Sequence, residues 1–157
     1  MRKMFQKILV AIDGSEYSKR AVDHAVGLAE KFGGSIILIH VYSATVPVVT
    51  SMDTMSGPSI TPPVSSEMAA KITEEAEKRG RRILDEAEKL VKIRGISVES
   101  ILVEGDAVRE IVRLAQERSV DLIVVGHRGQ SRLREVFLGS VSEGLSHKAT
   151  CPVLIVR

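Results

Sequence analysis

The chain has 157 residues, of which 44% are hydrophobic and 27% are charged, and its formal net charge is +2. At roughly 100–200 residues per domain, this length predicts a single domain with a sizeable core. Aromatic residues make up only 3% of the chain and tryptophan is absent. Nucleic acid is not expected as a partner, because such proteins usually carry a basic stripe with aromatic residues for stacking.

The sequence also indicates the cellular compartment in which the protein is expected. No stretch approaches the roughly 18 consecutive apolar residues that cross a bilayer, so no membrane association is expected. Lys7 and Asp13 interrupt the first apolar stretch too early for a signal peptide. The single cysteine, Cys151, cannot form an internal disulfide, which suits a reducing cytosol. We therefore expect a cytoplasmic protein in which Cys151 is a small core residue rather than a nucleophile.

The start of the chain predicts two buried strands around one helix. Lys7–Ile12 is a continuous apolar run rich in β-branched residues, and Ser35–Val41 repeats that pattern. Continuous apolarity indicates strands that are covered on both faces, as in a parallel sheet. The helix between them is expected to begin at a cap formed by Ser15 or Ser18 and to run to about Phe32, where two glycines stop it.

The next stretch, from Tyr42 to about Val64, differs from the rest of the chain. It is rich in serine, threonine and proline and has no helical periodicity. Loops of this length are uncommon and are usually functional lids or disordered segments. Both interpretations, a mobile linker and an ordered lid, stay open at this point.

The remainder of the chain continues the alternation. Ser65–Arg94 predicts one long amphipathic helix, in which Gly80 marks a weak point or a bend. Its expected buried stripe comprises Ile72, Ala76, Ile83, Ala87, Leu90 and Val91. Then follow a strand at Val98–Val103, a helix at about Ala107–Arg118, a strand at Asp121–Val125, a short helix near Val141–Lys148 and a last strand at Pro152–Val156. Strands and helices that alternate in this way predict an α/β domain with a parallel sheet and helices on both faces.

A glycine-rich loop follows the fourth predicted strand. Gly126 and Gly129 can adopt positive φ and let the backbone approach a ligand closely. Nine residues later, Gly139-Ser140 stands where a helix begins, so free N–H groups and the helix dipole favour an anion there. The hydroxyl of Ser142 adds a donor, as does that of Ser140. A phosphate chain could lie across the two glycine clusters, although glycines also collect in loops for turn geometry alone.

Two further features bear on the anion hypothesis. The intervening segment carries Arg132 and Arg134, which could screen phosphate charge. Asp13 ends the first predicted strand, and open α/β sheets bind ligands beyond the carboxyl ends of strands at a topological switch point. If the first and fourth strands are neighbours, Asp13 faces Gly126, where its carboxylate could accept ribose hydroxyls or contact a magnesium ion. The alternative role for Asp13 is that of a turn residue before a helix.

At this point a family resemblance becomes specific. The pattern G-x2-G-x9-G-[ST], formed by Gly126, Gly129, Gly139 and Ser140, resembles the nucleotide-binding signature of the universal stress protein family. The opening ILVAIDGSEYSKRAVDHAVGLA and the closing CPVLIVR resemble the same family, so the likeness covers essentially the whole chain except the Tyr42–Val64 stretch. The chain is similar to the ATP-binding members, since it keeps all the signature glycines.

The resemblance implies a fold, a ligand and an assembly. The fold would be an open five-stranded parallel sheet in the order 3-2-1-4-5, Rossmann-like and of the adenine nucleotide alpha hydrolase type, in one domain spanning 1–157. The ligand would be ATP, or another adenine nucleotide, with Mg²⁺, and Asp13 is the possible magnesium contact. The residues implied to bind it are Ala11, Asp13, Val41, Gly126, Arg128, Gly129, Gly139, Ser140, Val141 and Ser142. The terminal strand at Val153–Val156 would pair with its copy in a homodimer, and a downstream protein partner is expected but not identified.

Three classes of function remain open. Neither a P-loop nor the G-x-G-x-x-G pattern of dinucleotide enzymes is present. Phosphoryl transfer needs a positioned nucleophile, metal ligands and positive charge at the leaving phosphate, and the sequence assigns no catalytic base. His127 lies inside the loop, but no acid or nucleophile is spaced to act with it. We expect a nucleotide-dependent regulator of the stress response; the alternatives are a slow ATPase or kinase-like enzyme, and a dimeric scaffold without nucleotide turnover.

Overall fold

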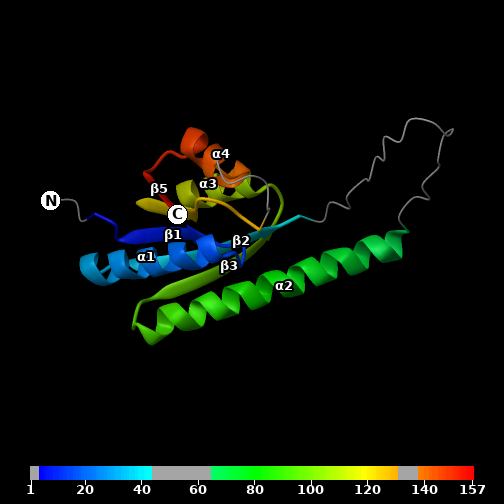
Figure 1. The fold of residues 1–157 in the computed structure, drawn as a ribbon, viewed down its shortest axis with the longest axis horizontal. Coiled ribbons are helices and arrows are strands. Elements are labelled where there is room, and N and C mark those ends of the chain that lie inside the picture. The colour runs from blue at the N-terminus through cyan, green and yellow to red at the C-terminus, as the bar shows by residue number, and fades with distance from the viewer. Residues whose placement is uncertain (1–3, 44–64, 131–137) are drawn as a thin grey trace.

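The computed structural model describes residues 4–43, 65–130 and 138–157. Over these residues strands and helices alternate (Figure 1). The strands are β1 (Lys7–Ala11), β2 (Ser35–Tyr42), β3 (Val98–Glu104), β4 (Leu122–Gly126) and β5 (Val153–Val156). The helices are α1 (Glu16–Phe32), α2 (Ser66–Ile93), α3 (Ala107–Glu117) and α4 (Ser140–Lys148). The predicted α/β order is confirmed. Of the lid or linker expected at Tyr42–Val64, Tyr42 belongs to β2 instead, and residues 44–64 lie outside the described residues, as do Arg132 and Arg134.

The strands form one parallel sheet in the order β3-β2-β1-β4-β5, as predicted. β1 occupies the middle, where Leu9 is paired with Ile37 of β2 on one side and with Ile123 of β4 on the other. The chain runs outward from β1 to β3 and then returns to β4 on the other side. The strand order therefore reverses between β1 and β4, which makes their carboxyl ends the switch point of the sheet.

Two apolar clusters explain why the central strands are apolar at every position. Successive side chains of a strand point to opposite faces. Ile8 and Val10 of β1 pack into the cluster beneath α1 and α2, whereas Leu9 and Ala11 pack into the cluster beneath α3 and α4. Figure 1 shows these helices as two layers with the sheet between them. Helices on both faces were expected, and the structure has them.

α2 is the longest helix and crosses β2 and β3. It runs without interruption through Gly80, where a weak point or a bend was expected. Gly80 is buried instead, and a Cβ at that position would stand 2.6 Å from both His40 Cδ2 and Leu102 Cδ1. The glycine lets the helix backbone lie directly on the sheet. No helix within the described ranges is both long and apolar enough to cross a membrane.

The buried stripe of α2 was only partly predicted. Ala87 and Val91 are buried as expected, but Leu90 is 51% exposed and Leu84 takes a core position that the prediction missed. Ile72 is exposed as well. At 1.5 Å per residue a helix of this length exceeds the span of the strands it covers, and its first half extends past the sheet (Figure 1). The core contacts therefore begin only at Gly80.

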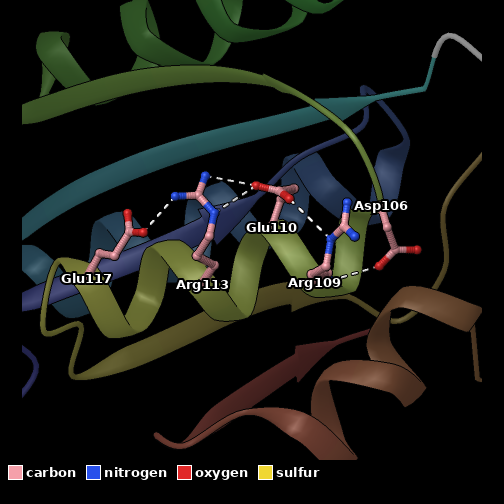
Figure 2. A network of polar contacts seen from close by, with 5 residues as sticks. All are labelled: Asp106, Arg109, Glu110, Arg113 and Glu117. Carbon is pink, nitrogen blue, oxygen red and sulfur yellow. Dashed lines mark hydrogen bonds and ion pairs between the residues drawn. The ribbon is translucent and has the colours of Figure 1, made fainter.

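α3 carries a line of alternating charges on its outer face (Figure 2). Asp106 caps the helix by accepting from the backbone N–H of Arg109 at 2.9 Å. Arg113 bridges Glu110 at 2.8 Å and Glu117 at 2.7 Å, one residue on each neighbouring turn. These contacts stabilise the helix along its outer face. The first turn of α3 lies at the switch point of the sheet, where Ala107 lines a cavity.

Candidate functional site

A cavity of about 560 Å³ opens at the carboxyl ends of β1 and β4. The two strand ends lie side by side there, because Ala11 is paired with Val125. The cavity is lined by Ala11, Ile12, Asp13, Ser18, Ile39, Val41, Ala107, Ile111, Val125, Gly126, Arg128, Gly129, Gln130, Leu138, Gly139, Ser140, Val141 and Ser142. All the residues that the sequence analysis named as binding candidates are among them. The sequence reasoning thus led to residues that the fold brings to one place.

The turn after β1 supplies the carboxylate. Asp13 Oδ1 accepts a hydrogen bond from the backbone N–H of Ser15 at 2.9 Å. Gly14 has φ +82°, which permits the tight reversal into α1. Ser15 then caps α1 by accepting from Ser18 N at 3.1 Å, which decides between the two caps that the sequence allowed. Asp13 is therefore both a turn residue and a cavity residue, so its two proposed roles are compatible.

The glycines that follow β4 are required by close contacts. A Cβ at Gly126 would lie 2.8 Å from the backbone of Tyr17 in α1. A Cβ at Gly129 would lie 2.6 Å from Asp13 Oδ2. Real Cβ atoms do not approach other atoms this closely, so a side chain at Gly126 would push the loop away from α1, and one at Gly129 would displace the Asp13 carboxylate or the loop. Gly129 also shows that the loop and the Asp13 carboxylate face each other.

The start of α4 forms the third wall. The backbone N–H of Gly139 donates to His127 O at 2.9 Å, which ties the helix start to the loop after β4. The next N–H groups belong to the first turn of α4, and first-turn groups have no partner within their own helix. With the positive end of the helix dipole they form a place that favours an anion.

Ser142 has a structural role that the sequence did not indicate. Its hydroxyl is buried and donates to backbone carbonyls, at 3.0 Å from His127 O and 2.9 Å from Gly139 O. The hydroxyl proton is therefore used within the protein in this structure, and its role as a donor to a ligand stays a prediction. Ser142 holds the loop against α4, and Ser140, which is exposed on the first turn, retains the donor role.

The inner wall of the cavity is apolar. Ile39 and Val41 of β2, Val125 of β4 and Ala107 and Ile111 of α3 line it. A flat apolar wall beside a polar loop suits a ligand with one aromatic and one charged end. The sequence analysis did not identify Ala107 and Ile111 as site residues, because their spacing does not show which strand lies beside the first turn of α3.

Gln130 was also missed, although it directly follows the signature glycine. Its Nε2 donates to the backbone carbonyl of Asp13 at 2.7 Å. This bond joins the loop after β4 to the turn after β1 from the solvent side. A polar residue next to Gly129 was the available signal, but its partner lies 117 positions away in the chain.

His127 sits at the junction of the loop, α4 and β5. Its backbone N–H donates to Val156 O at 2.6 Å, and its carbonyl accepts from Gly139 and Ser142. Partial burial, with the charges of Arg157 and Arg128, lowers the pKa of the imidazole below 6.5. The residue contributes to the site through its backbone hydrogen bonds.

Comparisons with known proteins agree with this geometry. The model of the universal stress protein family matches residues 4–157. The chain belongs to the universal stress protein family. Universal stress protein YxiE of Bacillus subtilis is 41% identical over 154 residues, which cover 98% of this chain and 100% of that protein.

Solved structures of the family share the fold. Universal stress protein UspA from Lactobacillus plantarum superposes with a TM-score of 0.81 at 18% identity, over 99% of this chain and 100% of that one. A universal stress protein solved in complex with cAMP has a TM-score of 0.66 at 29% identity and covers 98% of both chains. The first of these likenesses supports the fold alone.

Proposed function

We propose that this universal stress protein binds an adenine nucleotide, ATP with Mg²⁺, in the cavity at the switch point and acts as a nucleotide-dependent regulator in the stress response. The observation that carries the proposal is the composition of the cavity. An apolar wall, a carboxylate, two close-packed loop glycines and a helix start line one space of about 560 Å³. Each of these parts suits a different portion of one nucleotide.

The apolar wall from β2, β4 and α3 suits the adenine ring, and the backbone of Val41 lies at the place for its edge. Asp13 suits the ribose hydroxyls, because a carboxylate accepts two hydrogen bonds from a diol. Gly126, Arg128 and Gly129 suit the ribose and the first phosphates. The first turn of α4, from Ser140, suits the phosphate tail for the reasons that make helix starts anion sites.

The family relationship supports an adenine ligand. The relative solved with cAMP shares 29% identity across nearly the full length of both chains. Cyclic AMP contains the adenine, ribose and phosphate that the cavity would have to hold. The choice of ATP over a monophosphate rests on two separate polar stretches in the cavity lining, one at Gly126 and Gly129 and one at the start of α4.

Magnesium fits the site as a companion of the phosphates. Mg²⁺ usually takes one or two carboxylates, with substrate phosphates and water completing its coordination. Asp13 offers one carboxylate that faces Gly129 through Oδ2. When bound, the ion would neutralise phosphate charge. The described residues contain no group of three or more acidic, histidine or cysteine side chains that could hold a metal by themselves.

A regulatory role is favoured over turnover for a chemical reason. Within the described part of the chain, His127 is the histidine that lies in the loop after β4, and its hydrogen bonds are made through its backbone. Among the cavity residues that the structure describes, the acidic side chain is Asp13, which the proposal assigns to the ribose or to Mg²⁺ rather than to proton transfer. Nucleotide binding without a group assigned to proton transfer leaves hydrolysis slow.

The proposal predicts that Gly129→Val abolishes nucleotide binding. A valine would force Cβ to within 2.6 Å of Asp13 Oδ2 and fill the space beside the loop. We expect the Kd for MgATP, measured by isothermal titration calorimetry, to rise at least tenfold, equivalent to about 1.4 kcal/mol. Gly27→Ala is the matched control, because nothing lies within 4 Å of a Cβ at that position. Equal affinities of Gly129→Val and wild type would show that the cavity is not the nucleotide site.

The alternative functions predict different results in assays of ATP hydrolysis and MgATP binding. Steady ATP hydrolysis that Asp13→Ala removes while MgATP binding persists would identify a slow ATPase. An absence of binding by the wild type at millimolar MgATP would leave a dimeric scaffold. The nucleotide that co-purifies with the protein, identified by mass spectrometry, distinguishes ATP from AMP as the resident ligand.

A further inference from the structure

α2 approaches the turn after β1 directly through Ile83 and indirectly through His40 of β2. Gly80 packs against the ring of His40, whose Nδ1 lies 2.7 Å from the backbone carbonyl of Ile12. Three residues further on, the Ile83 side chain lies 3.1 Å from the position of a Cβ on Gly14. The helix is therefore in close contact with the segment that presents Asp13.

A polar chain adds a third contact. The guanidinium of Arg79 on α2 donates from Nη2 to Gln130 Oε1. Gln130 in turn donates from Nε2 to the carbonyl of Asp13 at 2.7 Å. Gln130 uses both ends of its amide, so one side chain joins α2, the end of the glycine loop and the turn after β1.

The loop needs such a connection for a physical reason. Glycines leave a loop backbone more conformations than other residues do, and contacts such as those of Gly126 and Gly129 limit them in the absence of ligand. Any freedom that remains has to be lost when a ligand binds. A contact that fixes the loop beforehand lowers this cost and so raises affinity. The amide of Gln130 fixes the loop to the Asp13 turn, and Arg79 fixes the orientation of that amide.

We propose that Arg79 and Gln130 are positioning residues that form a latch between α2 and the glycine loop, and that this latch preorganises the cavity for an adenine nucleotide. The latch rests on the proposed function. Arg79 acts on affinity through Gln130 rather than by touching the nucleotide. α2 thereby becomes part of the binding site without lining the cavity.

A double-mutant cycle on the full chain tests the latch. MgATP affinity is measured by isothermal titration calorimetry for wild type, Arg79→Ala, Gln130→Ala and the double variant. Loss of one hydrogen bond of this kind is expected to weaken binding by about threefold to tenfold. Because both residues act through one contact, the double variant is expected to bind as Gln130→Ala does. Arg82→Ala, which removes the same charge from an exposed neighbouring position of α2, is the matched control and is expected to bind as wild type does.

The outcomes separate the two proposals. A wild-type protein that does not bind MgATP overturns the proposed function and the latch together. A wild type that binds, with Arg79→Ala and Arg82→Ala of equal affinity, overturns the latch alone. Losses that multiply in the double variant also overturn it, because they would show Arg79 acting by its charge and not through Gln130. Thermal melting of each variant verifies that the fold is retained.

Discussion

Glycines in two helices of this protein have opposite effects on packing. Gly27 in α1 faces open space, since nothing lies within 4 Å of a Cβ built there. Gly80 in α2 is buried against His40 and Leu102 at distances of 2.6 Å from its ideal Cβ. His40 cannot move away easily, because its Nδ1 is hydrogen bonded to Ile12 O. Intrinsic helix propensity is the same for both glycines, so the surroundings decide what a methyl group does.

We therefore predict that Gly27→Ala and Gly80→Ala change stability in opposite directions. Gly27→Ala should stabilise the protein by about 0.5–1 kcal/mol, the propensity difference between the two residues. Gly80→Ala should destabilise it by about 1–3 kcal/mol, as overpacking of a filled interface does. Urea unfolding of both variants beside wild type measures the two values. A Gly80→Ala protein as stable as Gly27→Ala would show that α2 can move off the sheet at little cost.

For individual residues, the positions that require glycine could be predicted from the sequence more reliably than the hydrogen-bond partners of polar side chains. Gly126 and Gly129 could be singled out because glycine has few uses other than close approach or positive φ. The hydroxyl of Ser142 was expected to face a ligand, yet it donates to His127 O and Gly139 O. Gln130 was overlooked, because its partner depends on the turn after β1 lying across from it. A polar side chain can satisfy its hydrogen bonds in several ways, and only the fold chooses among them.

At the scale of the element, α3 shows how a surface helix is held by charge. The Glu110 side chain is only 12% exposed and lies between two arginines (Figure 2). The hydrogen bond from Arg113 lowers the pKa of Glu110 below 4.5, and its effect outweighs partial desolvation, which acts in the opposite direction. These ion pairs join residues of α3 to one another and so stabilise the helix itself. Since α3 also supplies Ala107 and Ile111 to the cavity wall, the stability of the helix bears on the site.

We predict that Glu110→Gln lowers the melting temperature at pH 7 and that the difference from wild type disappears in acid. A carboxylate whose pKa is lowered by folding stabilises the protein above its unfolded pKa and loses that effect as the pH falls through the folded pKa. The gap should therefore close as the pH falls below about 4.5. Glu117→Gln, on a side chain that is 52% exposed, is the control and should change less. A gap that stays constant from pH 7 through the acid range would assign the effect to packing instead of charge.

The elements themselves could be predicted well, and the reason is the two-sided core. Strands covered on both faces leave continuous apolar runs, and the caps at Ser15 and Gly33 bound α1 clearly. The phase of α2 was harder to predict. Its apolar residues are spread around more than one face, and only contact with the sheet decides that Leu84 is buried and Leu90 exposed. A long helix that extends past its sheet does not bury its whole apolar stripe.

The whole molecule has two different sheet edges. β3 carries Glu99 and Glu104 on one edge, and charged side chains discourage another strand from pairing there. β5, on the other edge, is Val-Leu-Ile-Val and carries no charge. An uncharged apolar edge strand is open to pairing with a second copy. This asymmetry supports the expectation, drawn earlier from the family resemblance, that the protein dimerises through Val153–Val156.

The register of β5 shows which backbone groups face outward. Ile123 N donates to Pro152 O and His127 N donates to Val156 O, so the even-numbered residues of this segment face β4. In a parallel pair these groups alternate, and the N–H groups of Val153 and Ile155 therefore point away from the sheet. An outward N–H can be removed without breaking the bonds between β4 and β5.

We predict that Ile155→Pro converts a homodimer into a monomer. Proline removes the outward N–H and is tolerated on an edge strand, whereas Ile155→Ala shortens the same side chain and keeps the N–H. Sedimentation velocity at micromolar concentration is expected to give a dimer for wild type and for Ile155→Ala, and a monomer for Ile155→Pro. A monomeric wild type, or a dimeric Ile155→Pro, would exclude pairing through β5. Val156 O of β5 accepts a hydrogen bond from His127 N, and His127 belongs to the loop that lines the cavity after β4. A dimer that fixes β5 would therefore also fix the position of this loop.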